Sequence, residues 1–354
     1  MKLLDRYIAR NVVQAAAVVA LAVAALSIVV AFIGEADNLG EGDYGIWQLV
    51  QYLLLRLPED MHLVLPVIAL LGALIALGGL AAGGELVVMR AAGVSIARLA
   101  GSVLRAGLVL AAVSLLLGEF LGPRGVEVAD GLRDIARHGH QKYRVDEGLW
   151  LRDGRDYVRI GGALATDRLI DITVYRRDEA GRLTSILGAE RAERIAGGWR
   201  LFGTQITRFG DAAVAVERVE RHDVDLGLRP EMLQFSVTKP DELATLGLYR
   251  YVRYLERNGV AAGEYRLAMW RNIVSPLTVI VLTLFALPFA FGSLRGAGAG
   301  QRLFLGGLVG LVFFMINEIG VAGGQVAGLP PWLTAALPTA LLLAGTLYWL
   351  RRLN

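Results

Sequence analysis

The sequence has no cysteine, four histidines and few charged residues. Asp, Glu, Lys and Arg make up 19% of its 354 residues, whereas about a quarter is typical of soluble domains. Without cysteine, the chain cannot form disulfides, thiolate nucleophiles, iron–sulfur clusters or cysteine-based zinc sites. This absence fits an oxidising periplasm and the cytoplasm equally well.

The charged residues are concentrated in one stretch. Hydrophobic residues make up 55% of the chain, and residues 124–268 hold 47 of its 69 charged side chains. This distribution excludes both a uniformly soluble fold and a disordered chain. It predicts membrane-spanning blocks on either side of one soluble insert. The net charge of +3 sits beside apolar runs, which indicates membrane topology rather than nucleic-acid binding.

Six apolar segments are long enough to cross a membrane. A spanning helix needs roughly 20 apolar residues. A cleaved signal peptide is the alternative for the first segment, but its apolar run of about 22 residues is longer than a signal-peptide core, so we expect a retained anchor. The six segments are 12–33, 63–82, 99–121, 272–291, 303–326 and 332–350.

Basic residues gather on one side of these spans. The two terminal segments and the second and fourth connections carry ten basic and two acidic residues, whereas the first connection carries one basic and six acidic residues. The positive-inside rule therefore places both termini in the cytoplasm and the insert on the opposite side. The ten basic residues are Lys2, Arg6, Arg10, Arg90, Arg98, Arg105, Arg295, Arg302, Arg351 and Arg352.

The insert is predicted to be β-structure from residue 124 to about residue 237. Short β-rich runs such as 157–160, 169–175 and 214–219 are separated by turn signals, a pattern typical of a sandwich, jelly roll or open barrel. A helix at 243–258 then leads back to the membrane. The insert's histidines show no metal-ligand spacing, and no Gly-x-Ser-x-Gly motif occurs, so we expect no catalytic or metal site. These histidines are His138, His140 and His222.

The connection at 84–98 is predicted to form a short helix. Residues at three- and four-residue spacing form one weakly apolar face: Leu86, Met89, Gly93 and Ile96. Glu85 lies at the N-terminal end, where the helix dipole favours a carboxylate. One interpretation is an interfacial helix whose arginines, including Arg90, contact lipid headgroups. The other is a docking helix for a cytoplasmic partner, with Glu85 available to pair with a basic residue there.

Small and ionisable residues mark the fifth span. Gly320 and Gly324 lie four residues apart, a spacing that lets membrane helices pack closely, and a substrate pathway is the alternative. Glu318 is expected deeper in this span, within about two turns of its outer end, with a proton relay as the alternative. Gly296 lies in a glycine-rich loop that superficially resembles a phosphate-binding loop. No Gly-Lys-Ser/Thr motif occurs in the chain, so we expect the chain to hydrolyse no nucleotide.

Several short motifs together resemble one protein family, the lipopolysaccharide export permeases LptF and LptG. The resemblance covers the whole chain, in register with three spans, an insert and three spans. Within the family, the first and third motifs are more similar to LptG than to its paralogue LptF. The motifs are Leu4-Asp5-Arg6-Tyr7-Ile8, Leu70-Leu71-Gly72-Ala73-Leu74, Glu85-Leu86-Val87-Val88-Met89-Arg90-Ala91-Ala92-Gly93, Gly118-Glu119-Phe120, Gly148-Leu149-Trp150 and Met269-Trp270.

The resemblance implies an α-helical membrane subunit with six transmembrane helices and an inserted all-β, jelly-roll-like periplasmic domain. Residues 1–123 would hold spans one to three with the coupling helix, 124–240 the periplasmic domain, and 241–354 a connecting helix and spans four to six. Such a subunit is not an enzyme. It sits in the Gram-negative inner membrane beside an LptF-like permease and contacts an LptB-like ATPase dimer, which binds ATP and Mg²⁺. It passes lipopolysaccharide to an LptC-like single-span protein.

The resemblance also assigns roles to single residues. Glu85 matches the coupling-helix glutamate that contacts the ATPase, which extends the docking role to Leu86, Met89 and Arg90. Arg133 matches a basic residue implicated in holding lipid A phosphates, and a charge-assisted contact is its physical rationale. A solvated surface charge is the alternative for Arg133.

The sequence departs from the family pattern at the outer end of the first span. Where relatives often carry lysine, this chain has Ala31 and Gly34, followed by Glu35 and Asp37, which would repel a phosphorylated lipid unless divalent cations bridge them. We therefore expect no substrate contact there. Two other functions remain open, a membrane-anchored periplasmic receptor or scaffold, and a permease for another lipid or lipoprotein.

Overall fold

The computed structural model describes residues 3–138, 149–153, 156–165, 167–196, 198–210, 213–225, 239–291 and 298–353. His140, Arg295 and Gly296 lie outside these residues. The chain forms two compact units. The helical unit combines the N-terminal region up to Asp37 with Leu53–Glu127 and the chain from Arg266 onward, and the sheet unit combines Asn38–Tyr52 with Val128–Tyr265.

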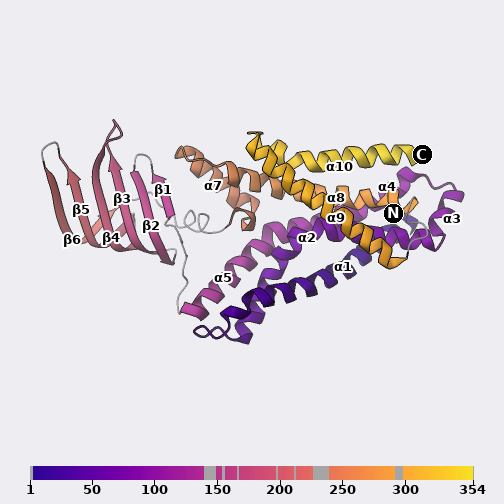
Figure 1. The fold of residues 1–354 in the computed structure, drawn as a ribbon, viewed down its shortest axis with the longest axis horizontal. Coiled ribbons are helices and arrows are strands. Elements are labelled where there is room, and N and C mark those ends of the chain that lie inside the picture. Colours follow the sequence, from indigo (N-terminus) through magenta and orange to yellow (C-terminus); the bar gives the residue numbers. More distant parts are fainter. Residues whose placement is uncertain are drawn as a thin grey trace. The chain divides into compact units, whose positions relative to one another are not determined.

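Six of the described helices are long and apolar enough to cross a membrane, as predicted. Three of them, which start at Leu3, Ile46 and Gly263, begin well before the predicted spans, because their first turns carry polar residues that a count of apolar residues leaves out. Figure 1 shows the short helix α3 at the end of the helical unit where both termini lie. The helices that carry the spans are α1 (Leu3–Glu35), α2 (Ile46–Ala82), α4 (Ile96–Leu116), α8 (Gly263–Phe291), α9 (Ala299–Val326) and α10 (Pro331–Leu353).

The interior of the helical unit is built where helices α1, α2, α4 and α8 meet. Their buried side chains form one cluster that includes Ile8, Leu70, Leu99 and Leu282. Gly72 lies directly against the backbone of Ala16, so that a Cβ at residue 72 would overlap it. The glycine in this motif therefore allows the close approach of α1 and α2.

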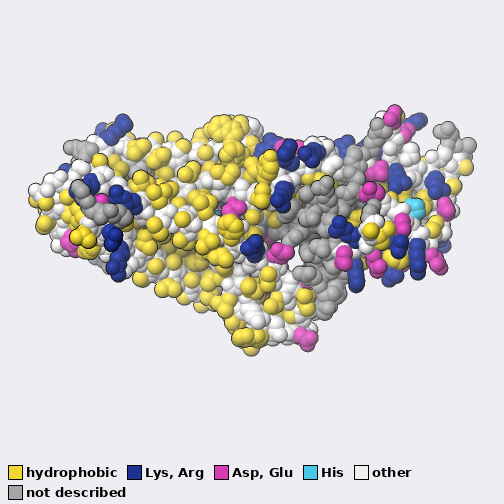
Figure 2. All heavy atoms as spheres, turned by 180° about the vertical axis from the view of Figure 1, so that it is seen from behind, with side chains coloured by type: hydrophobic (Ala, Val, Ile, Leu, Met, Phe, Trp, Pro, Cys, Tyr) yellow, Lys and Arg dark blue, Asp and Glu magenta, His cyan; other side chains and the backbone are white. Residues whose placement is uncertain are grey.

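The outer surface of the helical unit is apolar. In the most apolar window of α1 only 11% of the residues are buried, and in that of α9 only 17%. Leu21 and Val30 of α1 and Leu311 of α9 are among the exposed side chains. Figure 2 shows a broad apolar surface along the helical unit and basic side chains gathered at the end that carries α3. Such a surface suits a hydrocarbon environment, in which helices satisfy their own backbone hydrogen bonds.

The third span continues into a helix that the sequence analysis missed. Helix α4 runs through a π-helical turn, Leu117–Leu121, into α5 (Gly122–His138). The prediction of β-structure from residue 124 was therefore wrong for the residues of α5, and the first strand among the described residues begins at Leu149. A Cβ at Gly125 would overlap the carbonyl of Leu55, which indicates that this glycine serves close helix packing.

The sheet unit contains one six-stranded antiparallel sheet in the order β1-β2-β3-β4-β5-β6, which confirms the prediction of an inserted all-β domain. Each described strand pairs with its neighbour in sequence, so this part of the chain is a meander without the crossovers of a closed jelly roll. One face is buried and includes Ile160, Leu201 and Trp199. Helix α7 (Thr245–Arg257) follows the sheet. The strands are β1 (Leu149–Asp153), β2 (Asp156–Ala165), β3 (Arg168–Arg177), β4 (Leu183–Ile195), β5 (Gly198–Phe209) and β6 (Val214–Val224).

Cross-strand ion pairs lie on the exposed face of this sheet. Arg200 on β5 donates two hydrogen bonds, of 2.8 and 2.9 Å, to the carboxylate of Asp223 on β6. These bonds lower the pKa of the Asp223 carboxyl below its ordinary value of 3.8. The pKa of Asp223 is lower in the folded than in the unfolded chain. The ion pair therefore stabilises the sheet at pH values above the ordinary pKa, and this contribution is lost as the pH falls through the lowered pKa.

Asp223→Asn is expected to speed amide hydrogen exchange in β5 and β6 at neutral pH by a small factor, because exposed ion pairs contribute little. The difference between variant and wild type should shrink as the pH falls through the lowered pKa of Asp223, because the wild-type carboxylate then also becomes neutral. Exchange followed by mass spectrometry at several pH values measures both effects, and comparison at equal pH cancels the intrinsic exchange rate. Equal protection of the two proteins at neutral pH would contradict this assignment.

Candidate functional site

The segment predicted as one helix at 84–98 consists of two. Helix α3 (Glu85–Ala91) follows Gly84, which has a φ of 74°. The helix ends at Ala91, and Gly93, with a positive φ of 83°, turns the chain just after its C-cap residue Ala92. Ser95 then caps α4, its hydroxyl accepting a hydrogen bond from the Arg98 backbone N–H at 3.3 Å. Two glycines and a cap therefore hold α3 in a sharp turn between two spans.

Helix α3 presents only part of its surface to the outside. Leu86 is 2% exposed and belongs to the core cluster of the helical unit, and Met89 packs against the same cluster. Val87 and Val88 are 44% and 68% exposed, and Arg90 is also exposed. The apolar face that periodicity indicated is thus the face packed inside this chain, and the outward face is formed by Val87, Val88 and Arg90.

Glu85 has a partner within the chain. The Tyr7 hydroxyl on α1 donates a hydrogen bond of 2.9 Å to Glu85 Oε2. Sequence reasoning missed this contact because the two residues lie 78 positions apart and only the packing of α1 beside α3 brings them together.

A second polar contact ties α1 to α4. Asp5 is 6% exposed, and its carboxylate accepts hydrogen bonds from Arg98 Nε at 3.3 Å and Ser102 Oγ at 3.2 Å. Arg105 Nη1 lies 3.0 Å from the other carboxylate oxygen. Three donors compensate for the burial of this charge, which would otherwise be costly. Arg98 and Arg105, whose charges indicate the membrane topology, therefore also stabilise the contact between α1 and α4.

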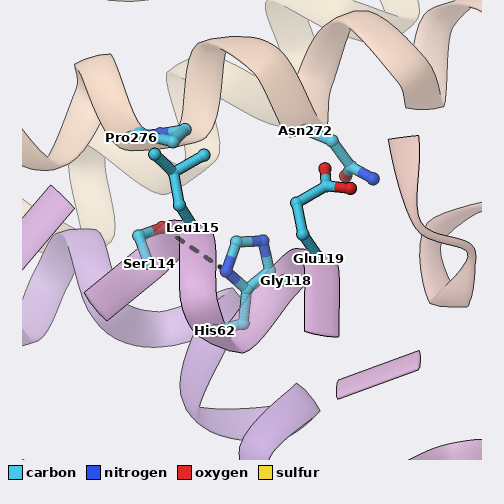
Figure 3. A pocket seen from close by; sticks show the side chains of 7 residues that line it. All are labelled: His62, Ser114, Leu115, Gly118, Glu119, Asn272 and Pro276. Atoms are coloured by element: carbon cyan, nitrogen blue, oxygen red, sulfur yellow. Dashed lines mark hydrogen bonds between the residues drawn. The ribbon is translucent and has the colours of Figure 1, made fainter. Parts of the chain in front are cut away.

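A shallow polar pocket lies farther along the helical unit (Figure 3). His62 of α2 lies at its centre, with Nδ1 3.4 Å from Ser114 Oγ, and Glu119 of the π-helical turn points toward Asn272 of α8. The imidazole ring lies on Gly118, where a Cβ would come within 2.6 Å of it. This close packing explains the glycine of the Gly118-Glu119-Phe120 motif.

Glu318 on α9 forms an ion pair with Arg271 on α8, with 2.8 Å between Oε1 and Nη2. Paired charges are the usual form in which ionisable residues occur within membrane segments. This contact favours a packing role for Glu318 over a proton relay.

The glycines of α9 contact two different helices. A Cβ at Gly324 would lie 2.5 Å from Thr334 Cγ2 of α10, and Gly320 lies against Pro338 of the same helix. The earlier pair, Gly306 and Gly310, lies against Leu71, Leu74 and Val67 of α2. The fifth span is thus packed closely against the second and sixth spans of its own chain.

In the sheet unit, Arg133 of α5 is held by neighbouring side chains. Its Nη1 donates to Tyr52 Oη at 3.1 Å, and its guanidinium lies 5.0 Å from the centre of the same ring. Nη2 lies 3.2 Å from Asp130 Oδ1. These contacts fix its position, and its phosphate-binding role stays a prediction. Within the described residues, no group of His, Asp and Glu side chains could hold a metal ion.

Comparisons with known proteins agree with this architecture. The sequence model of the family described as "Lipopolysaccharide export system permease LptF/LptG" matches residues 6–352. The chain is similar to the lipopolysaccharide export system permease protein LptG of Escherichia coli strain K12, at 33% identity over 99% of the chain and 98% of that protein. It is similar to LptG of Haemophilus influenzae at 31% identity over 98% and 97%. The six membrane spans, the inserted sheet and these matches show that the chain belongs to the LptF/LptG family of lipopolysaccharide export permeases.

Proposed function

We propose that the chain is the non-catalytic permease subunit of an ATP-driven transporter that extracts lipopolysaccharide from the inner membrane. It would pass the lipid through the sheet unit to a periplasmic bridge. The single observation that supports the coupling role best is the outward face of α3, because Val87, Val88 and Arg90 stay exposed at a sharp turn between two spans. Exposed apolar residues rimmed by charge are typical of protein-binding surfaces.

The proposed orientation follows from charge. Basic side chains gather at the end of the helical unit that carries α3 and both termini. Under the positive-inside rule this end faces the cytoplasm, and the sheet unit belongs in the periplasm. The ATPase dimer, which resembles LptB in this proposal, would then dock on α3 and bind ATP and Mg²⁺ itself. Nucleotide-driven movement of α3 would be the input to transport.

In this proposal the lipid enters a cavity between this chain and a second permease. The apolar side chains of α1 and α9 are largely exposed within this chain, and they would face acyl chains or an LptF-like partner. Hydrophobic burial suits acyl chains, whereas a basic residue such as Arg133 suits lipid A phosphates. An LptC-like single-span protein would receive the lipid from the sheet unit.

A co-expression experiment tests this proposal. The tagged chain, purified in mild detergent, is expected to co-elute with an ATPase and a homologous six-span permease, and mass spectrometry should find bound lipid A. Elution of the folded chain alone, with ordinary phospholipid only, would favour a receptor or scaffold. An ATPase together with a different bound lipid or a lipoprotein would favour a permease for that substrate.

A further inference from the structure

The first turns of α1 are hydrogen-bonded or ion-paired to both α3 and α4. Tyr7 donates its hydrogen bond to Glu85 on α3, and Asp5 is bound to Arg98 and Arg105 on α4. Apolar contacts reinforce this connection, because Ile8 of α1 and Leu86 of α3 are buried in the same cluster. The N-terminal end of α1 and the α3 turn are therefore positioned to move together.

The second half of α1 has no fully buried side chain, although Ala20, Val23 and Ala24 still pack against a neighbouring core cluster. The buried residues of α1 all lie in its first half, from Asp5 to Val19, whereas later side chains such as Leu26, Val30 and Ile33 are exposed. The helix has 33 residues, which corresponds to a length of about 50 Å. A long helix held at one end amplifies a small change of angle into a larger displacement at the other end.

We propose that Tyr7 is a positioning residue that couples the docking helix α3 to the first span through its hydrogen bond to Glu85. This inference rests on the proposed function and deepens it. Glu85 then acts as an acceptor within the chain, and Val87, Val88 and Arg90 form the surface that meets the ATPase. Movement of α3 is transmitted to the C-terminal half of α1 because the Tyr7–Glu85 hydrogen bond joins α1 to α3 and the Asp5 contacts join α1 to α4.

The alternative role for Glu85 is an ion pair with a basic residue of the ATPase. Glu85→Gln separates the two roles, because an amide oxygen still accepts from the Tyr7 hydroxyl but carries no charge. Positioning by Tyr7 requires that Glu85→Gln keeps most of the transport and that Glu85→Leu loses it. Equal losses in the two variants would overturn the inference.

The direct test uses the complete transporter in lipid vesicles, with lipopolysaccharide released per ATP hydrolysed as the readout. Tyr7→Phe removes only the donating hydroxyl, and this ratio is expected to fall about threefold, less than for a buried hydrogen bond to a charged acceptor because this bond is exposed. The matched control is Tyr348→Phe on α10, whose exposed ring contacts Arg352 through its face. If Tyr7→Phe keeps the wild-type ratio, the inference about Tyr7 is overturned and the proposed function is not. If the wild-type transporter shows no ATP-dependent release, the proposed function itself is refuted.

A structural readout separates coupling from general destabilisation. Because the chain has no native cysteine, spin labels can be attached to cysteines placed at the exposed positions Leu26 of α1 and Leu341 of α10, with cysteine-free partner subunits. The distance between the labels is expected to change with nucleotide in the wild type and to stay constant in Tyr7→Phe. An equal change in both proteins would overturn the inference.

Discussion

Arginine in place of Glu85 is expected to abolish ATP-dependent release of lipopolysaccharide by the assembled transporter while the chain stays folded. A guanidinium has donors and no acceptor, so the Tyr7 O–H can no longer donate the 2.9 Å hydrogen bond that it gives to Glu85. The new positive charge also lies on the same short helix as Arg90. We expect release to fall by more than about tenfold, since a charged hydrogen bond is lost and a like charge is added. Release from vesicles and elution on size exclusion measure function and folding separately.

The control for this prediction is the same change of charge at a remote exposed position. Glu220 lies on β6 and is exposed, so Glu220→Arg should leave release near the wild-type rate. Wild-type release by Glu85→Arg would contradict any coupling role for α3. Aggregation of the variant would assign Glu85 to the folding of the helical unit rather than to coupling.

Substitution of Gly72 is expected to have the largest effect on stability. A Cβ at this position would overlap the backbone of Ala16, and backbone cannot move aside as a flexible side chain can. Gly72→Ala should destabilise the helical unit by about 1–3 kcal/mol, the usual cost of overpacking, and Gly72→Leu should prevent accumulation of folded protein. Thermal unfolding in detergent, followed by the fraction of monodisperse protein, measures the change.

Gly79 provides the matched control on the same helix. A Cβ there meets nothing within 4 Å, so Gly79→Ala is expected to be neutral or to stabilise α2 by up to about 1 kcal/mol through helix propensity. Equal melting temperatures for Gly72→Ala and Gly79→Ala would show that α1 and α2 separate without cost, against the close contact described above.

The long apolar runs and the alternating strands were predictable, whereas the helix after the third span was not. Span length and strand alternation are local properties of the sequence. In α5, by contrast, Gly122 and Gly125 have the local signature of a turn, and only the surfaces of Glu59 and Leu55 explain why glycine is needed there. Neighbours distant in sequence overrode the local signal.

The candidate coupling site was predictable as a segment but not in its contacts. The position of a short helix with Glu85 at its start followed from spacing and from the resemblance to the family. Which of its faces is buried depends on α1, and periodicity alone identifies an apolar stripe without saying what covers it. Leu86 and Met89 therefore pack inside the chain, while Val87 and Val88 face outward.

The sequence by itself determined the six spans, the inserted β domain and the balance of charge that indicates orientation, because these features depend on local composition and on the length of apolar runs. Only the tertiary structure decided that Tyr7 meets Glu85, that Asp5 meets Arg98 and Arg105, and that Arg271 meets Glu318. The physical reason is that each of these contacts joins residues on different helices, and their distance is set by how the helices pack rather than by any pattern along one segment.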